Sequence, residues 1–170
     1  MQPAGAVGPA SESVEQDLVA ELNQRPWVPE PHVQIHFATN RRLVKPASRE
    51  PDRFGDEIAR LRYGSCLVSI PLAVHRRGQL ERPRWWESPD PKKHILVEAV
   101  SCMADDTFLE MMKRALGNDG NDILVFVHGY ANAFENCVLT GARLKHDTEF
   151  AGPLVVFAWP SEGKTFNWLN

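Results

Sequence analysis

Residues 123–132, which read Ile-Leu-Val-Phe-Val-His-Gly-Tyr-Ala-Asn, constrain the fold of this chain more than any other segment. Five consecutive apolar residues predict a strand that is buried on both faces, as in a parallel sheet covered by helices. The strand ends at His128-Gly129, and Asn132 with Glu135 fits a capping box at the start of a helix. This pattern predicts a sharp turn in which a backbone amide is left free to face a reacting oxygen.

The residues that follow complete a βαβ unit. After Asn132, apolar residues recur at helical spacing, and Gly152-Pro153 ends the connection. Residues 154–158 form a second continuous apolar run, which predicts a second buried strand. The helical stripe consists of Phe134, Cys137, Val138, Gly141 and Leu144. A strand, a helix and a strand in this order predict a parallel crossover.

The first half of the chain predicts antiparallel or mixed strands. Residues 33–39 alternate apolar and polar side chains, so they predict a strand with one buried face. Two further strands are predicted at residues 66–70, after a turn at Tyr63-Gly64, and at residues 94–100.

Two loops and a helix connect these strands. Residues 40–58 and 75–91 are charged and contain prolines, so both predict surface loops. Apolar residues then recur at helical spacing from Phe108 to Leu116, and Asp105 and Asp106 suit the positive end of that helix. The fold class predicted for the whole is α/β.

Composition excludes several classes of function. The 170 residues carry a net charge of −3, with a pI near 6.1, which gives no electrostatic case for nucleic acid. No window approaches the roughly 18 apolar residues of a membrane span, and residues 1–10 lack the features of a secretory signal. Three cysteines are odd in number and widely spaced, which predicts free thiols and a cytoplasmic location.

The turn after the first apolar run can carry chemistry. Rigid backbone N–H groups at a strand-to-helix turn stabilise a tetrahedral oxyanion, and the helix dipole adds to the field. We predict that the amide of Tyr130 is such a donor, that Gly129 adopts a backbone conformation forbidden to a side chain, and that His128 holds the loop. These roles indicate the oxyanion-hole end of an α/β-hydrolase sheet. The alternative is a plain strand-ending turn in another α/β protein.

A second motif suggests nucleotide binding. Residues 158–165, Ala-Trp-Pro-Ser-Glu-Gly-Lys-Thr, follow a strand and match a loosened phosphate-loop pattern. Pro160 removes an amide from the loop, Trp159 is bulky where the chain must wrap phosphate, and residues 166–170 are too few for the helix that should follow. Nucleotide binding through Gly163-Lys164-Thr165 is therefore only a minor alternative.

The histidines predict no metal centre. His75, His94 and His146 are scattered along the sequence, whereas a zinc site needs convergent ligands at typical spacings. We interpret them as solvated or packed side chains, and the sequence predicts neither a metal nor another cofactor.

Two surface features have a structural interpretation. The adjacent Trp85-Trp86 can stack on a base or a sugar, but we expect one ring to pack on the core and the other to cover a loop. The basic cluster Asn40-Arg41-Arg42 predicts a solvated loop end.

No serine occupies a nucleophile elbow. A serine hydrolase of this fold needs Gly-x-Ser-x-Gly at a strand-to-helix turn, followed by Asp or Glu and then His. Ser65 precedes a predicted strand, and Ser161 follows one but stands after Pro160 without flanking glycines. We therefore predict no catalytic side chain in these 170 residues.

Several characteristic blocks occur at residues 35–41, 63–71, 78–81 with Trp85-Trp86, 125–130 and 157–161. Together these blocks resemble an uncharacterised bacterial α/β-hydrolase family of unknown function. In that family the His-Gly-Tyr turn continues with two asparagines, whereas here Ala131 replaces the first and Asn132 keeps the second. We expect the helix cap to survive and a loop hydrogen bond to be lost.

The resemblance implies serine-dependent hydrolysis of an ester or similar acyl bond in a small molecule. The similarity begins at about Val33. The nucleophile, acid and base that come later in members of the family are absent from this sequence. The resemblance implies a truncated, inactive N-terminal part of a hydrolase domain at residues 32–170, with an incomplete hydrolase-type sheet. Residues 1–31 would be a mobile tail, a short helix and a proline-rich connector.

One physical consequence is an open sheet edge. Residues 154–158 should lie beside the missing nucleophile strand, so their exposed edge would invite self-association. A different class of function is therefore also open: a non-catalytic binding or interaction module that uses this edge or the Trp85-Trp86 loop.

Overall fold

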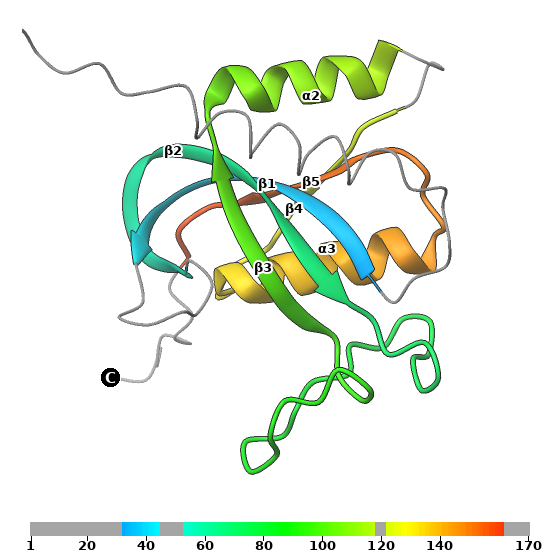
Figure 1. Cartoon of the computed structure of the whole chain (residues 1–170). Coiled ribbons are helices and arrows are strands. Elements are labelled where there is room, and N and C mark those ends of the chain that lie inside the picture. Colours follow the sequence, from blue (N-terminus) through cyan, green and yellow to red (C-terminus); the bar gives the residue numbers. More distant parts are fainter. Residues whose placement is uncertain (1–31, 45–52, 118–121, 162–170) are drawn as a thin grey trace, which may run out of the picture. The chain divides into compact units, whose positions relative to one another are not determined.

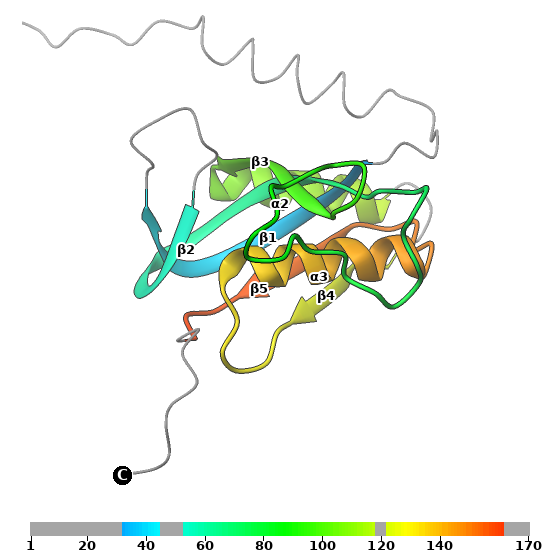
Figure 2. The same ribbon diagram turned by 90° about the horizontal axis from the view of Figure 1, so that it is seen from below.

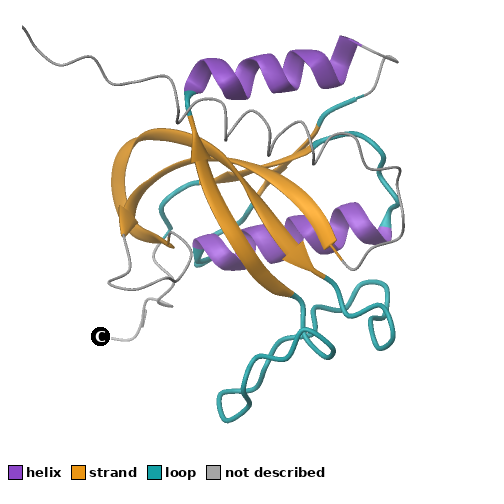
Figure 3. Ribbon diagram, in the orientation of Figure 1, coloured by secondary structure: helices purple, strands orange, loops and turns teal. Residues whose placement is uncertain are grey.

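The protein, described here as a computed structural model, contains a five-stranded mixed sheet and two helices in residues 32–44, 53–117 and 122–161 (Figures 1 and 3). The strand order in the sheet is β3-β2-β1-β5-β4. The predicted α/β fold class is confirmed. The elements are β1 (His32–Val44), β2 (Arg53–Ser69), β3 (Leu96–Met103), α2 (Asp105–Gly117), β4 (Leu124–Val127), α3 (Phe134–Asp147) and β5 (Leu154–Ala158).

The two helices cover opposite faces of the sheet (Figures 1 and 2). Successive residues of β5 show this directly, since Val156 packs in the cluster that contains α3 and Val155 packs against Phe108 and Met112 of α2. Every position of β5 is buried or half-buried, as its continuous apolar run predicted. No helix in the described part of the chain is long and apolar enough to cross a membrane.

The predicted βαβ unit is confirmed. β4 and β5 pair in parallel, with Leu124 opposite Leu154, and α3 connects them. Gly141 lets the helix approach the sheet closely, because a Cβ there would lie 2.6 Å from Cγ2 of Val156. The buried side of α3 includes four of the five predicted stripe residues, Phe134, Cys137, Val138 and Gly141.

The edge of the sheet differs from the prediction. β5 lies between β1 and β4, so the open edge at this side of the sheet belongs to β4 and not to residues 154–158. Burial of residues 123–127 on both faces was also wrong, since Val125 and Val127 are each 58% exposed. The apolar run of an edge strand and that of a central strand look alike in sequence, and only the pairing distinguishes them.

The antiparallel part of the sheet is longer than predicted. β1 and β2 continue through much of residues 40–58, which were wrongly predicted to be a loop, and Leu43 pairs with Phe54. β2 also runs straight through Tyr63-Gly64, where a turn was predicted. Gly64 is required by packing, because a Cβ there would lie 2.2 Å from the carbonyl oxygen of Ser101.

β1 is buried on both faces, whereas its alternation predicted one. Ile35 and Phe37 point into the α3 side of the core. His36 points the other way, where it is 7% exposed and meets Phe108 of α2 edge-on. The predicted loop at residues 75–91 is confirmed, and it passes beside α3 (Figure 2).

Candidate functional site: the turn after β4

Three parallel strands end at the same edge of the sheet. β1 pairs in parallel with β5, and β5 pairs in parallel with β4, so their carboxyl ends come together. The segment 128–132 follows β4 and leads into α3, and residues 159–161 follow β5. In open α/β sheets the crevice outside these strand ends is where ligands bind. The predicted site residues therefore lie where the fold class places function.

His128 ties the ends of β4 and β5 together. Its ring is 5% exposed and stacks on Trp159 with a centroid distance of 5.1 Å and an angle of 5° between the planes. Nε2 lies 3.1 Å from the carbonyl oxygen of Trp159, and the indole N–H of Trp159 donates to the carbonyl oxygen of His128 at 3.0 Å. Nδ1 lies 2.6 Å from the carbonyl oxygen of Gly129. These contacts fit the loop-holding role expected of His128.

Asn132 stabilises the turn from within, but it does not cap the helix as predicted. Its side-chain amide donates to the carbonyl oxygens of Tyr130, at 3.1 Å, and of Gly129, at 3.4 Å. The N-cap of α3 is Ala133, which makes no side-chain capping bond, so the capping box of Asn132 with Glu135 is not formed. Glu135 lies in the first turn of α3, where its charge suits the helix dipole.

Ser161 and Arg41 hold the backbone of Asn132 from the outside. The Asn132 N–H donates to Oγ of Ser161, whose hydroxyl also lies 3.1 Å from the Asn132 carbonyl oxygen. Nη2 of Arg41 donates to that carbonyl oxygen at 2.5 Å. Ser161 therefore serves as a hydrogen-bonding residue of the turn, and its side chain is engaged on both sides.

Arg41 is fully buried, which contradicts the predicted solvated loop end. Its side chain is 0% exposed, and Nη1 contacts Oδ1 of Asp56 at 2.5 Å and the carbonyl oxygen of Gly55 at 3.3 Å. The backbone N–H of Arg41 donates to Oγ1 of Thr39, which in turn donates to the carbonyl oxygen of Ala158. One buried cation thus links β1, β2 and the turn.

The contacts of the turn set the direction of the Tyr130 amide. A trans peptide places its N–H opposite its C=O, and no described peptide bond is cis. The Gly129 carbonyl faces the His128 ring and the Asn132 side chain, so the N–H of Tyr130 in the same peptide unit points away from both. The described residues offer this N–H no hydrogen-bond acceptor.

The special backbone conformation lies two residues after the position predicted. Gly129 does not have a positive φ, and a Cβ built there would meet nothing within 4 Å. Ala131 has φ 60°, in the left-handed region that costs an alanine about 1–2 kcal/mol. Asparagine tolerates this region better than alanine.

Sequence reasoning missed Arg41 and Thr39 as parts of this site. Both lie far from residues 128–132 in the chain, and β1 brings them there by pairing with β5. The block of residues 35–41 offered a signal, because the strand continues beyond Thr39 and includes a charged residue. The charge of Arg41 suggested exposure to solvent, and only the pairing of β1 shows that the side chain is buried.

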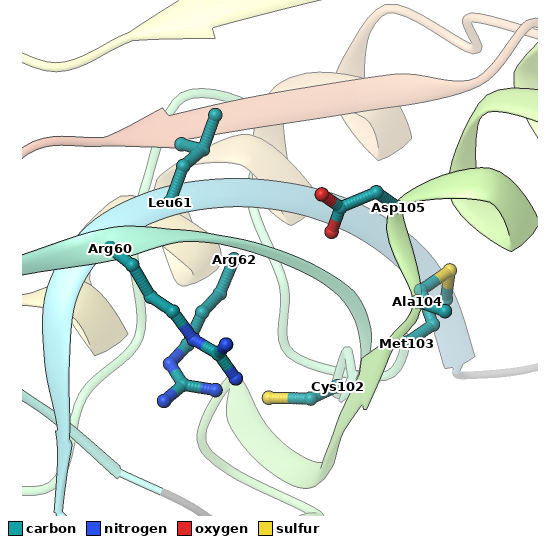
Figure 4. Close-up of a pocket in the computed structure, with 7 residues that line it drawn as sticks. All are labelled: Arg60, Leu61, Arg62, Cys102, Met103, Ala104 and Asp105. Carbon is teal, nitrogen blue, oxygen red and sulfur yellow. The ribbon is translucent and has the colours of Figure 1, made fainter.

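A pocket lies away from this turn, between β2, β3 and the start of α2 (Figure 4). Its volume is about 340 Å³, and neither the residues of the turn nor Arg41 line it. The side chains of Arg60 and Arg62 project together from β2, with Cys102 and Asp105 near the end of β3 (Figure 4). We assign no chemistry to this pocket.

The two tryptophans are both exposed, so the prediction that one packs on the core was wrong. Trp85 is 92% exposed and Trp86 is 62% exposed, and their rings meet edge-on at 5.1 Å. The guanidinium of Arg84 lies 5.5 Å from the ring centre of Trp86. Residues 163–165, the nucleotide-binding alternative, lie outside the described residues, as do residues 1–31 with the predicted tail and helix.

Two of the histidines that looked scattered in sequence lie together. His75 and His146 meet with ring centres 5.1 Å apart, beside Asp147 and Glu81. Burial lowers the pKa of His75, but the hydrogen bonds that its ring donates to the Asp147 and Glu81 carboxylates outweigh this effect and raise that pKa above its ordinary value. This cluster lies at the far end of α3 from the turn.

The fold places the protein in the class of α/β domains with a mixed sheet, consistent with part of an α/β-hydrolase domain. Residues 104–169 match the model of a family described as "Alpha/beta hydrolase of unknown function (DUF900)". The match covers less than half of the chain, and it includes both strands of the βαβ unit and the turn at residues 128–132. No match was found among curated proteins or among solved structures.

Proposed function

We propose that this chain supplies the oxyanion-stabilising part of an ester or acyl hydrolase site, with the backbone N–H of Tyr130 as the donor. The observation that carries the proposal is the orientation of the Gly129–Tyr130 peptide, whose carbonyl oxygen is engaged by His128 and Asn132. A donor that is fixed before reaction costs no reorganisation when negative charge develops on the substrate.

The surroundings of the turn favour rigidity. The stacked ring of His128, the side chain of Asn132 and the pair formed by Ser161 and Arg41 each fix a different backbone group. Preorganisation of this kind matters because an oxyanion donor acts through its fixed position. The donor must already point at the place where negative charge develops in the transition state. Loss of one such donor typically slows acyl transfer by about 100–1,000-fold.

The 170 residues contain no nucleophile elbow, so we propose that this polypeptide alone does not turn over esters. The second donor of such a site is the amide after the nucleophile, and it would have to come with that residue. The buried Cys66 and Cys137 form no disulfide, and on that basis we also propose a reducing, cytoplasmic location.

Amide exchange and ligand titration by nuclear magnetic resonance test the donor. The Tyr130 amide should exchange far faster than ladder amides such as that of Val156, and methylphosphonate, a small stable oxyanion, should shift its resonance. As the matched control, Tyr130 is replaced by its α-hydroxy acid analogue, which keeps the side chain and turns the N–H into an ester oxygen. The phosphonate-induced shifts of neighbouring resonances should then disappear.

Two results would overturn this proposal. One is a Tyr130 amide protected as strongly as that of Val156, since a sealed amide cannot serve a substrate. The other is turnover of p-nitrophenyl acetate by the 170-residue chain above the buffer rate, because it would require a nucleophile that we do not assign.

The exposed tryptophans favour a second candidate, a binding surface on the loop between β2 and β3. Trp85 and Trp86 are free of the core, and Arg84 covers one of them. Exposed aromatic rings beside arginine are common at interaction surfaces. Replacing both rings with alanine should change the free energy of unfolding by less than about 0.5 kcal/mol. A loss well above that would show that the rings pack on the domain, and this candidate would be withdrawn.

A further inference from the structure

A cluster of four ionisable side chains joins the loop between β2 and β3 to the carboxyl end of α3. His75 lies at its centre with a side chain 4% exposed, and it contacts Oε2 of Glu81 through Nδ1 and Oδ1 of Asp147 through Nε2, each at 2.8 Å. Nδ1 of His146 lies 3.4 Å from the same Asp147 oxygen. The cluster brings together residues that are distant in sequence.

Three of these side chains present metal-ligand atoms to one point. One ligand atom from each of His75, His146 and Asp147 lies within 4.8 Å of the others. Two imidazoles and one carboxylate are a common protein ligand set for zinc, and the fourth position is then taken by water. Ligand oxygens and nitrogens about 2.0–2.2 Å from the ion stand roughly 3.4 Å apart in a tetrahedral site, so small side-chain rotations bring these atoms into place.

The surroundings of the cluster orient its ligands as a metal site requires. A histidine that binds metal through one ring nitrogen usually donates its other N–H to a carboxylate, which fixes the ring. Glu81 is placed to accept that N–H from His75, and its other oxygen accepts the backbone N–H of Arg76 at 3.1 Å. Oδ2 of Asp147 accepts the Gly78 N–H at 2.7 Å, which leaves Oδ1 facing the two imidazoles.

We propose that Nε2 of His75, Nδ1 of His146 and a carboxylate oxygen of Asp147 form a binding site for a divalent transition metal, with Zn²⁺ as the best fit. Glu81 is a positioning residue that orients His75. The site is separate from the turn after β4, because α3 runs from Phe134 near the turn to Asp147 at the cluster. Its role would be to fasten the tryptophan-bearing loop to the helix, in addition to the hydrogen bond from Arg143 to the Gly78 carbonyl oxygen.

Zinc titration of the untagged chain tests the site. Binding is measured by calorimetry and by competition with a chromophoric chelator. All proteins carry Cys102→Ser, because thiolates are zinc ligands and a cysteine outside the cluster would complicate the titration. We expect one Zn²⁺ per chain and a rise in the thermal midpoint with zinc. Cobalt should give the absorption of a low-coordinate site with nitrogen and oxygen ligands, without a thiolate charge-transfer band.

His146→Ala is the decisive variant, because His146 is the most exposed ligand and its loss should leave the fold intact. It should weaken zinc binding at least tenfold. Glu81→Gln, which keeps the shape of the side chain, should weaken it by about 10–100-fold, as other outer carboxylates do. His32→Ala is the matched control, since it removes a histidine beside Glu98 on the surface and should leave the affinity unchanged.

Circular dichroism confirms that each variant is folded before its affinity is compared. A folded Cys102→Ser reference protein that binds no zinc at micromolar concentrations would overturn the proposal. It would also be overturned if folded His146→Ala bound zinc as tightly as the control, because the ion would then sit elsewhere. Neither result bears on the Tyr130 amide, so this proposal and the proposed function fail independently.

Discussion

Asp56 should matter more to stability than its position suggests. It lies on the surface of β2 with a side chain 49% exposed, but its partner Arg41 is 0% exposed. Substitution of a surface carboxylate is usually almost neutral, since an exposed ion pair contributes about 0–1 kcal/mol. Here Asp56→Ala removes the negative charge beside a guanidinium that cannot reach water. A buried charge left without its partner costs about 3–5 kcal/mol.

The structure sets the magnitude and the order of two variants. After Asp56→Ala, Arg41 keeps the carbonyl oxygens of Gly55 and Asn132, so we expect the low end of the range, about 3 kcal/mol. Arg41→Met fills most of the same space without a charge, and the Asp56 carboxylate can be solvated. The Asn132 carbonyl keeps the hydroxyl of Ser161, so about 2 kcal/mol is expected. The surface variant should therefore be the more damaging of the two.

Urea unfolding of the two single variants and the double variant measures these free energies. The double variant should be no less stable than Asp56→Ala, because without Arg41 no buried charge is left without a partner. Glu57→Ala is the matched control, since its partner Arg42 is 63% exposed, and it should lose less than about 0.5 kcal/mol. An Asp56→Ala variant as stable as Glu57→Ala would refute the account of Arg41 as a buried cation that holds the turn.

Three further outcomes are expected. Ala131→Asn should raise the free energy of unfolding by about 0.5 kcal/mol by easing the left-handed backbone, while Gly129→Ala should change it by less than that; thermal unfolding giving the reverse order would place the strain elsewhere. Burial, helped by the charge of Lys145, lowers the pKa of His36 from 6.5 to about 4. Between these two pH values the imidazole is therefore protonated in the unfolded chain and neutral in the folded chain. Stability should therefore fall by roughly 3 kcal/mol as the pH drops from 6.5 to 4, and the fall should be absent from the matched curve of His36→Gln. Burial raises the pKa of the Cys66 and Cys137 thiols, so thiol titration of the native protein should label Cys102 alone. Fast labelling of more than one thiol would contradict the burial of the other two.

The sequence predicted the elements best where one period is sustained. The helix after residue 132 and the strand at residues 154–158 were placed well, because a helical stripe indicates a helix and a continuous apolar run indicates a strand, although the run does not show whether the strand is central or at an edge. The hairpin of β1 and β2 was missed, since long twisted strands with charged side chains look like a loop. The charge of a side chain is then a poor guide to its exposure. Arg41 is buried, because the pairing of the strands brings its partners close to it.

The candidate site was predicted in part for the same reason. Local signals located the turn at residues 128–132, but they could not show that Ala131, and not Gly129, takes the unusual backbone conformation. The cap was misplaced by one residue because the side chain of Asn132 is used inside the turn. The histidine cluster was invisible, since its members come from a loop and a helix that the fold brings together.

The order of the strands decides how this sheet could grow. In the described part of the chain its two open edges are β3 and β4, and β5 is closed on both sides. A new strand that joined β4 in parallel would finish beside the Tyr130 amide, since parallel strands finish at a common edge. A strand that joined β3 would be separated from β4 by four other strands. A nucleophile delivered by complementation, from another polypeptide or from elsewhere in a larger protein, would therefore have to arrive on the β4 side.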